Sequence, residues 1–140
     1  MVNKLKTLPV EELEKNLPDT INEVLGVRIT HSGDDFIEAK MPVKNARPGF
    51  EFLTNGSMVV LSETIGSIGA SLTIDNKKFR CLGLAINVNH IAPVTNGFVT
   101  ATAKPLSIDG STQVWEIRIK NEENTLVCIS RLTVAVVSLS

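Results

Sequence analysis

The chain has 140 residues, of which 43% are hydrophobic and 21% are charged, and its formal net charge is −1. This length and composition predict one compact soluble domain with a sizeable core. A net charge so close to zero excludes the positive field that is typical of nucleic-acid or anionic-membrane binding. The basic residues are separated by neutral ones, and we interpret them as a solvated rim: Lys44, Arg47, Lys77, Lys78 and Arg80.

Cellular location and metal binding are constrained by what the sequence lacks. Cys81 and Cys128 lie far apart without metal-ligand spacing, so we expect reduced structural thiols and no metal site. The N-terminus lacks the apolar core of a secretory signal, and the longest apolar segment is interrupted by Ser57, Ser62 and Glu63. We therefore expect a cytoplasmic protein that binds neither membrane nor nucleic acid.

Residues 1–24 predict an N-terminal helical segment, which precedes a single domain at residues 25–140. One short helix is expected over about residues 9–16, with Pro9 near its start. A second is expected to run from Asp19, a favourable cap, to Leu25. We interpret both as outer helices or a lid.

A hairpin is predicted next, because Gly33 and Asp34 separate two candidate strands. In the second strand every other residue is apolar, which predicts that one face is buried: Ile37, Ala39 and Met41. Residues 43–55 contain Pro48 and Gly49 and predict an irregular loop.

A long apolar helix is predicted from about Gly56 to Leu72, with Thr54 or Asn55 as its cap. Its polar residues are few, so most of its faces should be enclosed. Each glycine costs about 1 kcal/mol of helix propensity relative to alanine, which suggests that close packing against a sheet dictates the small residues. These residues are Gly66, Gly69 and Ala70.

The remainder predicts four strands, at about residues 80–91, 96–106, 111–121 and 125–138. Trp115, Ile117 and Ile119 should face the core, since charged residues alternate with them. The nearly continuous apolar run of the last strand is typical of a strand inside a sheet. A hairpin, one long helix and four strands together predict an α+β fold in which one antiparallel sheet wraps a single central helix.

This order of elements is that of the hot-dog fold, and four stretches support a family. They are "LGVRITHSGDDFIEAKMPV", "NGSMVVLSETIGSIGA", "INVNHIAPVTNG", and "STQVWEIRI" followed by "LVCISRLTVAVV". Over about residues 25–138 the chain resembles the acyl-CoA thioesterases of the phenylacetate-degradation and enterobactin-proofreading type.

The resemblance implies a catalytic acid. In that family a glutamate stands seven residues after the second glycine of a His-Gly-Gly turn, and Glu63 stands seven residues after Gly56. The carboxylate would attack the thioester carbonyl or activate water. The family also implies homodimers paired edge to edge, often assembled as dimer-of-dimers tetramers, with Glu63 facing the partner chain. No cofactor is implied, because coenzyme A would enter only as part of the substrate.

Thioester hydrolysis needs little leaving-group protonation, so a base or nucleophile and a donor to the carbonyl oxygen suffice. Amides of the first helical turn, around Gly56 and Ser57, carry partial positive charge and are candidate donors. Ser67, one turn beyond Glu63, either orients the water or carboxylate or serves as a small packing residue.

Further candidates for substrate contact lie on the strands. Asn89 and His90 match a family position close to the acyl pocket, although a strand-end histidine is an equal interpretation. Ser111 and Thr112 match a position near the pantetheine or phosphates of coenzyme A, although polar residues are common where a turn meets a strand.

The turn before the central helix departs from the family. Thr54-Asn55-Gly56 stands where His-Gly-Gly is expected, so either Thr54 or Asn55 supplies the missing donor or turnover is slow. Losing one such donor can cost about 10²–10³ in rate. A family glutamine and two arginines are also absent, at Arg47-Pro48-Gly49, Ala92 and Gly110. Fewer phosphate contacts leave a carrier-protein substrate open.

The leading hypothesis is a thioesterase that hydrolyses acyl-CoA or acyl-carrier-protein thioesters, with Glu63 as base or nucleophile. The alternative is a catalytically degenerate acyl-thioester binding protein, motivated by the replaced histidine. A hot-dog dehydratase is a weaker third hypothesis, because those enzymes use a histidine and the sequence has none near the central helix.

Overall fold

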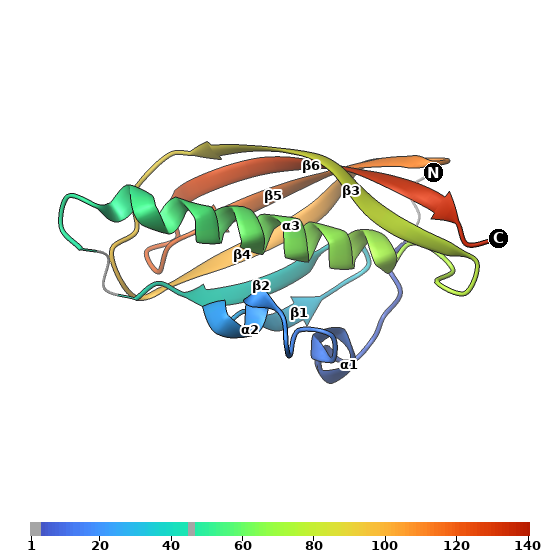
Figure 1. The fold of residues 1–140 in the computed structure, drawn as a ribbon, viewed down its shortest axis with the longest axis horizontal. Helices are drawn as coiled ribbons and strands as arrows, with labels where there is room; N and C mark the ends of the chain where they lie inside the picture. Colours follow the sequence, from blue (N-terminus) through green and yellow to red (C-terminus); the bar gives the residue numbers. More distant parts are fainter. Residues whose placement is uncertain (1–3, 45–46) are drawn as a thin grey trace.

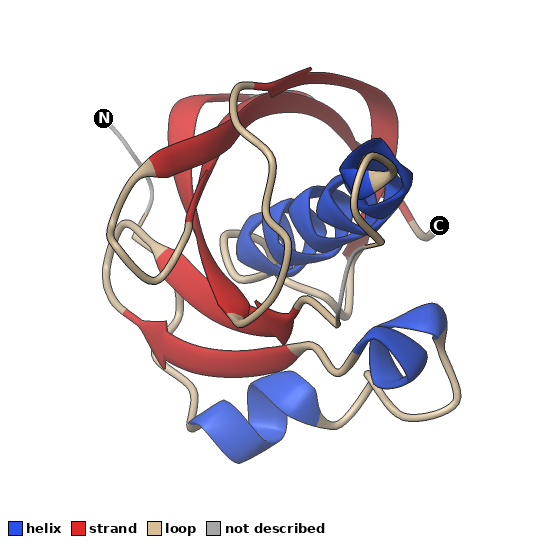
Figure 2. Ribbon diagram, turned by 90° about the vertical axis from the view of Figure 1, so that its left-hand side faces the viewer, coloured by secondary structure: helices blue, strands red, loops and turns tan. Residues whose placement is uncertain are grey.

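The computed structural model describes residues 4–44 and 47–140. Residues 1–3 of the predicted N-terminal segment and residues 45–46 of the predicted loop lie outside this description. Within residues 4–44 and 47–140, six strands form one antiparallel sheet in the order β1-β2-β4-β5-β6-β3, and one long helix, α3, packs against it. Figures 1 and 2 show the sheet curving around α3, which confirms the expected α+β hot-dog fold.

The elements follow the predicted order. They are α1 (Val10–Glu14), α2 (Ile21–Leu25), β1 (Arg28–Ser32), β2 (Ile37–Pro42), the 3-10 helix η1 (Glu51–Thr54), α3 (Asn55–Ser71), β3 (Phe79–His90), β4 (Phe98–Asp109), β5 (Thr112–Lys120) and β6 (Leu126–Ser138). The predicted loop at residues 43–55 is therefore wrong in its last part, where η1 leads directly into α3.

The core lies between α3 and the concave face of the sheet. Both alternating patterns are confirmed, because their apolar members are at most 1% exposed: Ile37, Ala39, Met41, Trp115, Ile117 and Ile119. The glycines of α3 allow close packing, as predicted. A Cβ atom on Gly66 would lie 2.7 Å from Leu132, and one on Gly69 would lie 2.7 Å from Trp115.

A buried polar chain fixes the end of α3 to the sheet. The indole Nε1 of Trp115 donates to Oε1 of Gln113 at 2.8 Å, and Gln113 Nε2 donates to Oγ1 of Thr73 at 2.7 Å. Thr73 lies two residues after α3 ends. The chain satisfies polar groups that would otherwise be costly to bury, so it holds α3 and β5 together at this end.

The N-terminal segment packs against the same core, because Leu5, Leu13 and Leu17 are buried in it. The expected cap of the second short helix was wrong. Thr20, not Asp19, has extended backbone and accepts the amide hydrogen of Asn22 through its hydroxyl. Asp19 has a φ of 65° and donates its own amide to Glu23, which suits the residue before a cap.

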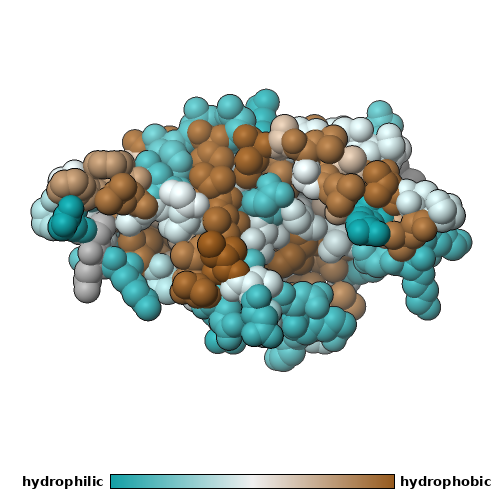
Figure 3. All heavy atoms as spheres, in the orientation of Figure 1, coloured by the Kyte–Doolittle hydropathy of each residue, from teal (hydrophilic) through white to brown (hydrophobic). Residues whose placement is uncertain are grey.

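The two edges of the sheet are β1 and β3. As far as the structure describes the chain, β3 pairs with β6 alone, and apolar side chains along it are exposed, including Phe79, Leu82 and Leu84. Figure 3 shows apolar surface crossing this face of the molecule from the β3 side over α3 toward α2. Among the described residues, no helix combines the length and the apolar character needed to cross a membrane.

Candidate active site

Glu63 lies in the middle of α3 and is half-buried. The hydroxyl of Ser67, one turn later, lies 3.4 Å from its Oε1 atom. Within the described ranges no lysine, arginine or histidine forms an ion pair with it. Among the described residues the carboxylate therefore has no counter-charge, and Ser67 is positioned to orient it.

The beginning of α3 differs from the expected cap. Thr54 occupies the cap position but has helical backbone and makes no capping hydrogen bond through its side chain. Its hydroxyl instead donates to the carbonyl oxygen of Glu51 at 2.7 Å. The amide of Asn55 donates to the carbonyl oxygen of Phe52 in η1. This first backbone donor of α3 is therefore already used within the protein.

The other groups at this end remain accessible. A Cβ atom on Gly56 would meet nothing within 4 Å, so a ligand can approach the backbone there. Asn55 and His90 line one open depression of about 310 Å³ together with η1 and the segment after β3. The remaining lining residues are Glu51, Phe52, Ile91, Ala92 and Pro93. The structure thus brings the start of α3 and the end of β3 together.

Three of the predicted substrate-contact residues lie apart from this depression. Asn89 precedes His90 on β3, so its side chain lies on the opposite face of the sheet, where its amide donates to Asn87. Ser111 and Thr112 lie at the turn between β4 and β5, next to Gln113 and therefore near the end of α3. Within one chain, the predicted substrate-contact residues therefore do not all line the same depression.

Distance along α3 separates the two parts of the proposed chemistry. Glu63 follows Gly56 by seven residues, which at 1.5 Å per residue is about 10 Å along the helix axis. A base must come within hydrogen-bond reach of its water, and the donors must contact the carbonyl oxygen of the same substrate. One chain therefore does not place Glu63 and its own first-turn amides around one carbonyl.

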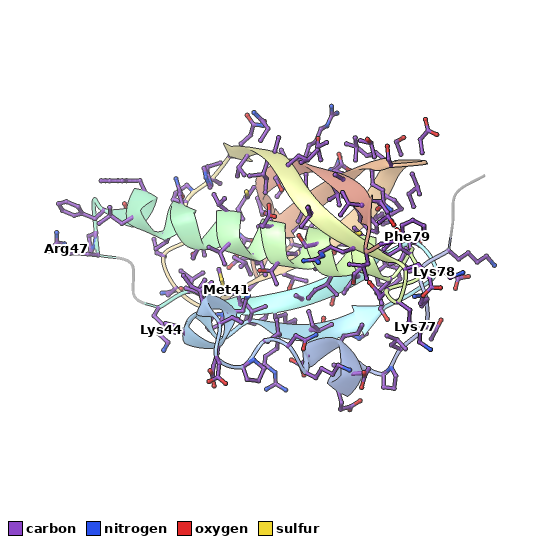
Figure 4. All side chains as sticks on the ribbon, turned by 45° about the vertical axis from the view of Figure 1, so that its right-hand side comes forward. Met41, Lys44, Arg47, Lys77, Lys78 and Phe79 are labelled. Carbon is purple, nitrogen blue, oxygen red and sulfur yellow. The ribbon has the colours of Figure 1, made fainter. Side chains whose placement is uncertain are left out.

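Basic side chains lie near both ends of α3. In Figure 4, Lys44 and Arg47 lie near the beginning of α3, and Lys77 and Lys78 lie at the opposite end of the molecule, beside Phe79. Arg47 lies over the ring of Phe50, with its guanidinium carbon 4.1 Å from the ring centre. Four of the basic residues interpreted as a solvated rim thus lie at two ends of the molecule.

Gly83 is a residue of this site that the sequence analysis missed. It lies on β3 against the Glu63 carboxylate, and a Cβ atom there would lie 2.3 Å from Oε1. The available signal was a glycine inside a predicted strand, which often marks a bulge or the close approach of another group. Which group approaches it depends on tertiary packing between α3 and β3.

Known proteins share both the sequence and the fold. The model of the thioesterase superfamily matches residues 50–128. Thioesterase HI1161 of Haemophilus influenzae is 41% identical with a TM-score of 0.89, and the match covers 99% of this chain and 96% of that chain. A mutant of thioesterase PA1618 of Pseudomonas aeruginosa is 34% identical with a TM-score of 0.91, and the match covers 99% and 100%.

A relative with a named substrate also matches. The 1,4-dihydroxy-2-naphthoyl-CoA hydrolase of Escherichia coli K12 is 41% identical over 113 residues, which cover 80% of this chain and 82% of that protein. These matches confirm the resemblance stated from the sequence. The chain belongs to the thioesterase superfamily.

Proposed function

We propose that this protein hydrolyses acyl-CoA thioesters, with Glu63 as the catalytic carboxylate. The observation that carries the proposal is the position of Glu63: it is half-buried in the central helix, without a counter-charge among the described residues and next to the Ser67 hydroxyl. The hydrolase from Escherichia coli acts on a CoA thioester, which supports the substrate class. A carrier-protein thioester is the second substrate that the test includes.

The reaction needs few groups. As a base, Glu63 takes a proton from water while the water oxygen attacks the carbonyl carbon; the C–S bond then breaks and the thiolate leaves. As a nucleophile, its carboxylate attacks the carbonyl carbon, the thiolate leaves, and water hydrolyses the resulting acyl anhydride. After a single turnover in oxygen-18 water, a labelled Glu63 with unlabelled released acid identifies the anhydride route, because direct attack by water labels only the released acid.

Asn55 is a better candidate than Thr54 for the missing carbonyl donor. The Thr54 hydroxyl already donates to Glu51, whereas Asn55 lines the depression that also contains His90. We expect Asn55→Ala to lower kcat by about 10²-fold, the cost of one lost carbonyl donor. Thr54→Val should change kcat little, since it removes a hydroxyl that serves the backbone.

The test of the catalytic acid is a thiol-release screen with short, aromatic and long acyl-CoA substrates and one acyl-carrier-protein substrate. Glu63→Gln should abolish turnover and leave the melting temperature and far-ultraviolet circular dichroism unchanged. Glu123→Gln, at the exposed turn before β6, is the matched control and should keep full activity. Equal activity of Glu63→Gln and the wild type would exclude the proposed role.

We infer further that two chains form the site, paired along their β3 edges. Glu63 and Gly56 are about 10 Å apart on one helix, and β3 has an unpaired edge with exposed apolar side chains. A two-fold axis at this edge runs the two α3 helices in opposite directions, so each Glu63 approaches the partner's helix start. A dimer of such dimers is the assembly that the family implies.

Mixed dimers test this arrangement. Glu63→Gln and Gly56→Val chains, each inactive alone, should form a heterodimer with about half the wild-type activity, because one of its two shared sites keeps both groups. A heterodimer of the wild type with the Glu63→Gln/Gly56→Val chain should be inactive, since each of its sites contains one altered residue. Sites contained within one chain would give the opposite pair of results.

A further inference from the structure

Gly83 meets the catalytic carboxylate directly. For a Cβ atom built on Gly83, the three nearest atoms all belong to Glu63: Oε1 at 2.3 Å, Cδ at 3.2 Å and Oε2 at 3.5 Å. Side-chain carbons are not found at 2.3 Å from a neighbour, so any residue larger than glycine requires a shift. The nearest oxygen is also the one that lies 3.4 Å from the Ser67 hydroxyl.

The backbone at this position does not itself require glycine. The φ angle of Gly83 is not positive, so alanine can adopt the same backbone conformation without strain. The pairing of β3 with β6 shifts between Gly83 and Ala85, which leaves Leu84 as the extra residue of a β-bulge. Bulges redirect side chains and often occur next to active sites. The feature that requires glycine here is therefore the space taken by Glu63.

We propose that Gly83 is a positioning residue: the absent side chain on β3 creates the space that holds the Glu63 carboxylate in its working position. The proposal rests on the proposed function of Glu63 and adds a second element, the β3 edge strand, to the control of its geometry. Ser67 contacts the carboxylate from α3, and Gly83 limits it from the sheet.

Alanine at position 83 should move the carboxylate and keep the fold. The tip of a flexible side chain yields more easily than the backbone, so relief of the contact requires Glu63 to withdraw by about 1 Å. A displacement of about 1 Å at a reacting group can cost up to about 10²-fold in rate. The substrate still binds, because the added methyl group contacts Glu63 and not the depression lined by Asn55 and His90.

Steady-state kinetics is the first test. Gly83→Ala should lower kcat by about 10- to 100-fold and change KM by less than about threefold. The displaced carboxylate stabilises the transition state less, whereas substrate binding is nearly unaffected. Ala85→Ser, on the same strand, is the control and should keep the wild-type kcat and KM. Wild-type kcat in Gly83→Ala would overturn the proposal.

Thermal unfolding tests the contact independently of activity. Gly83→Ala should lower the melting temperature of the wild type, and this loss should disappear in a Glu63→Ala background, where the added methyl has room. An equal loss in both backgrounds would overturn the proposal. If the wild type hydrolyses no thioester, the proposed function fails, and the unfolding cycle still decides whether Gly83 and Glu63 are coupled.

Discussion

The two edge strands of the sheet, β1 and β3, differ in how far other groups of the chain cover them. At the β1 edge, Glu14 of α1 forms a bidentate ion pair with Arg28 and accepts the backbone amide of Ile29 at 3.1 Å. A side chain of the same molecule thus accepts a hydrogen bond from a backbone amide of the edge strand. At the other edge, β3 has twelve residues, exposes Leu82 and Leu84, and within the described part of the chain pairs on one side alone.

The difference indicates which edge is available to another chain. Unpaired strand edges promote association unless they are covered or charged, and the β1 edge is both. The catalytic candidate Glu63 lies beside the open edge, against Gly83. Association and chemistry are therefore expected to share β3, whereas the β1 edge should contribute to stability alone.

The largest expected effect comes from a charge at the open edge. Leu84 is 63% exposed at the bulge of β3, and Leu84→Asp places like charges near the proposed two-fold axis. We expect the dimer to dissociate and thioester hydrolysis to be lost, as measured by light scattering after gel filtration and by thiol release. Leu106→Asp changes a similarly exposed leucine at the bulge of β4 and should keep the dimer.

A moderate effect is expected at the closed edge. Glu14→Ala removes the ion pair and leaves the Ile29 amide without its acceptor, which should lower the free energy of unfolding by about 1–2 kcal/mol. Arg28→Ala removes the ion pair alone, and the Arg28 side chain is 74% exposed, so the loss should be smaller than that of Glu14→Ala. Urea unfolding measures both values; kcat should not change in either variant. A loss of activity without unfolding would contradict the division between the edges.

The smallest effect concerns pH at the closed edge. The hydrogen bond from Arg28 holds the pKa of Glu14 below its ordinary value of 4.5, with the Ile29 amide also lowering it. A lowered pKa in the folded state stabilises the protein above about pH 4.5, and this contribution is lost as the pH falls through the folded pKa. Glu14→Gln should therefore be less stable than the wild type at pH 7, and the difference should vanish in acid.

Much of the fold followed from local patterns. The alternation around Ile37 and Trp115 gave the buried faces, and the small residues Gly66 and Gly69 indicated the close contact between helix and sheet. The ends of elements were harder. The cap at Asp19 was wrong because Thr20 competes for the same role, and η1 was missed because a 3-10 turn that continues into a helix lacks a separate hydrophobic period.

One part of the candidate site lies within the reach of sequence spacing. The spacing from Gly56 selects Glu63 as the candidate acid, since both lie on one helix where sequence separation fixes distance. Gly83 is twenty residues further along the chain, and its contact with Glu63 depends on how β3 packs over α3. No periodicity encodes such a contact, so the sequence offered a glycine in a strand without the reason for it.

Trp115 has a practical consequence. It is the single tryptophan in a chain without tyrosine, it is fully buried, and its ring lies against Gly69 while its Nε1 donates to Gln113. Its fluorescence therefore reports whether α3 remains packed against the sheet. An emission maximum that moves to longer wavelength would mark separation of helix and sheet, and one that stays constant during turnover would show that the scaffold does not open when substrate enters.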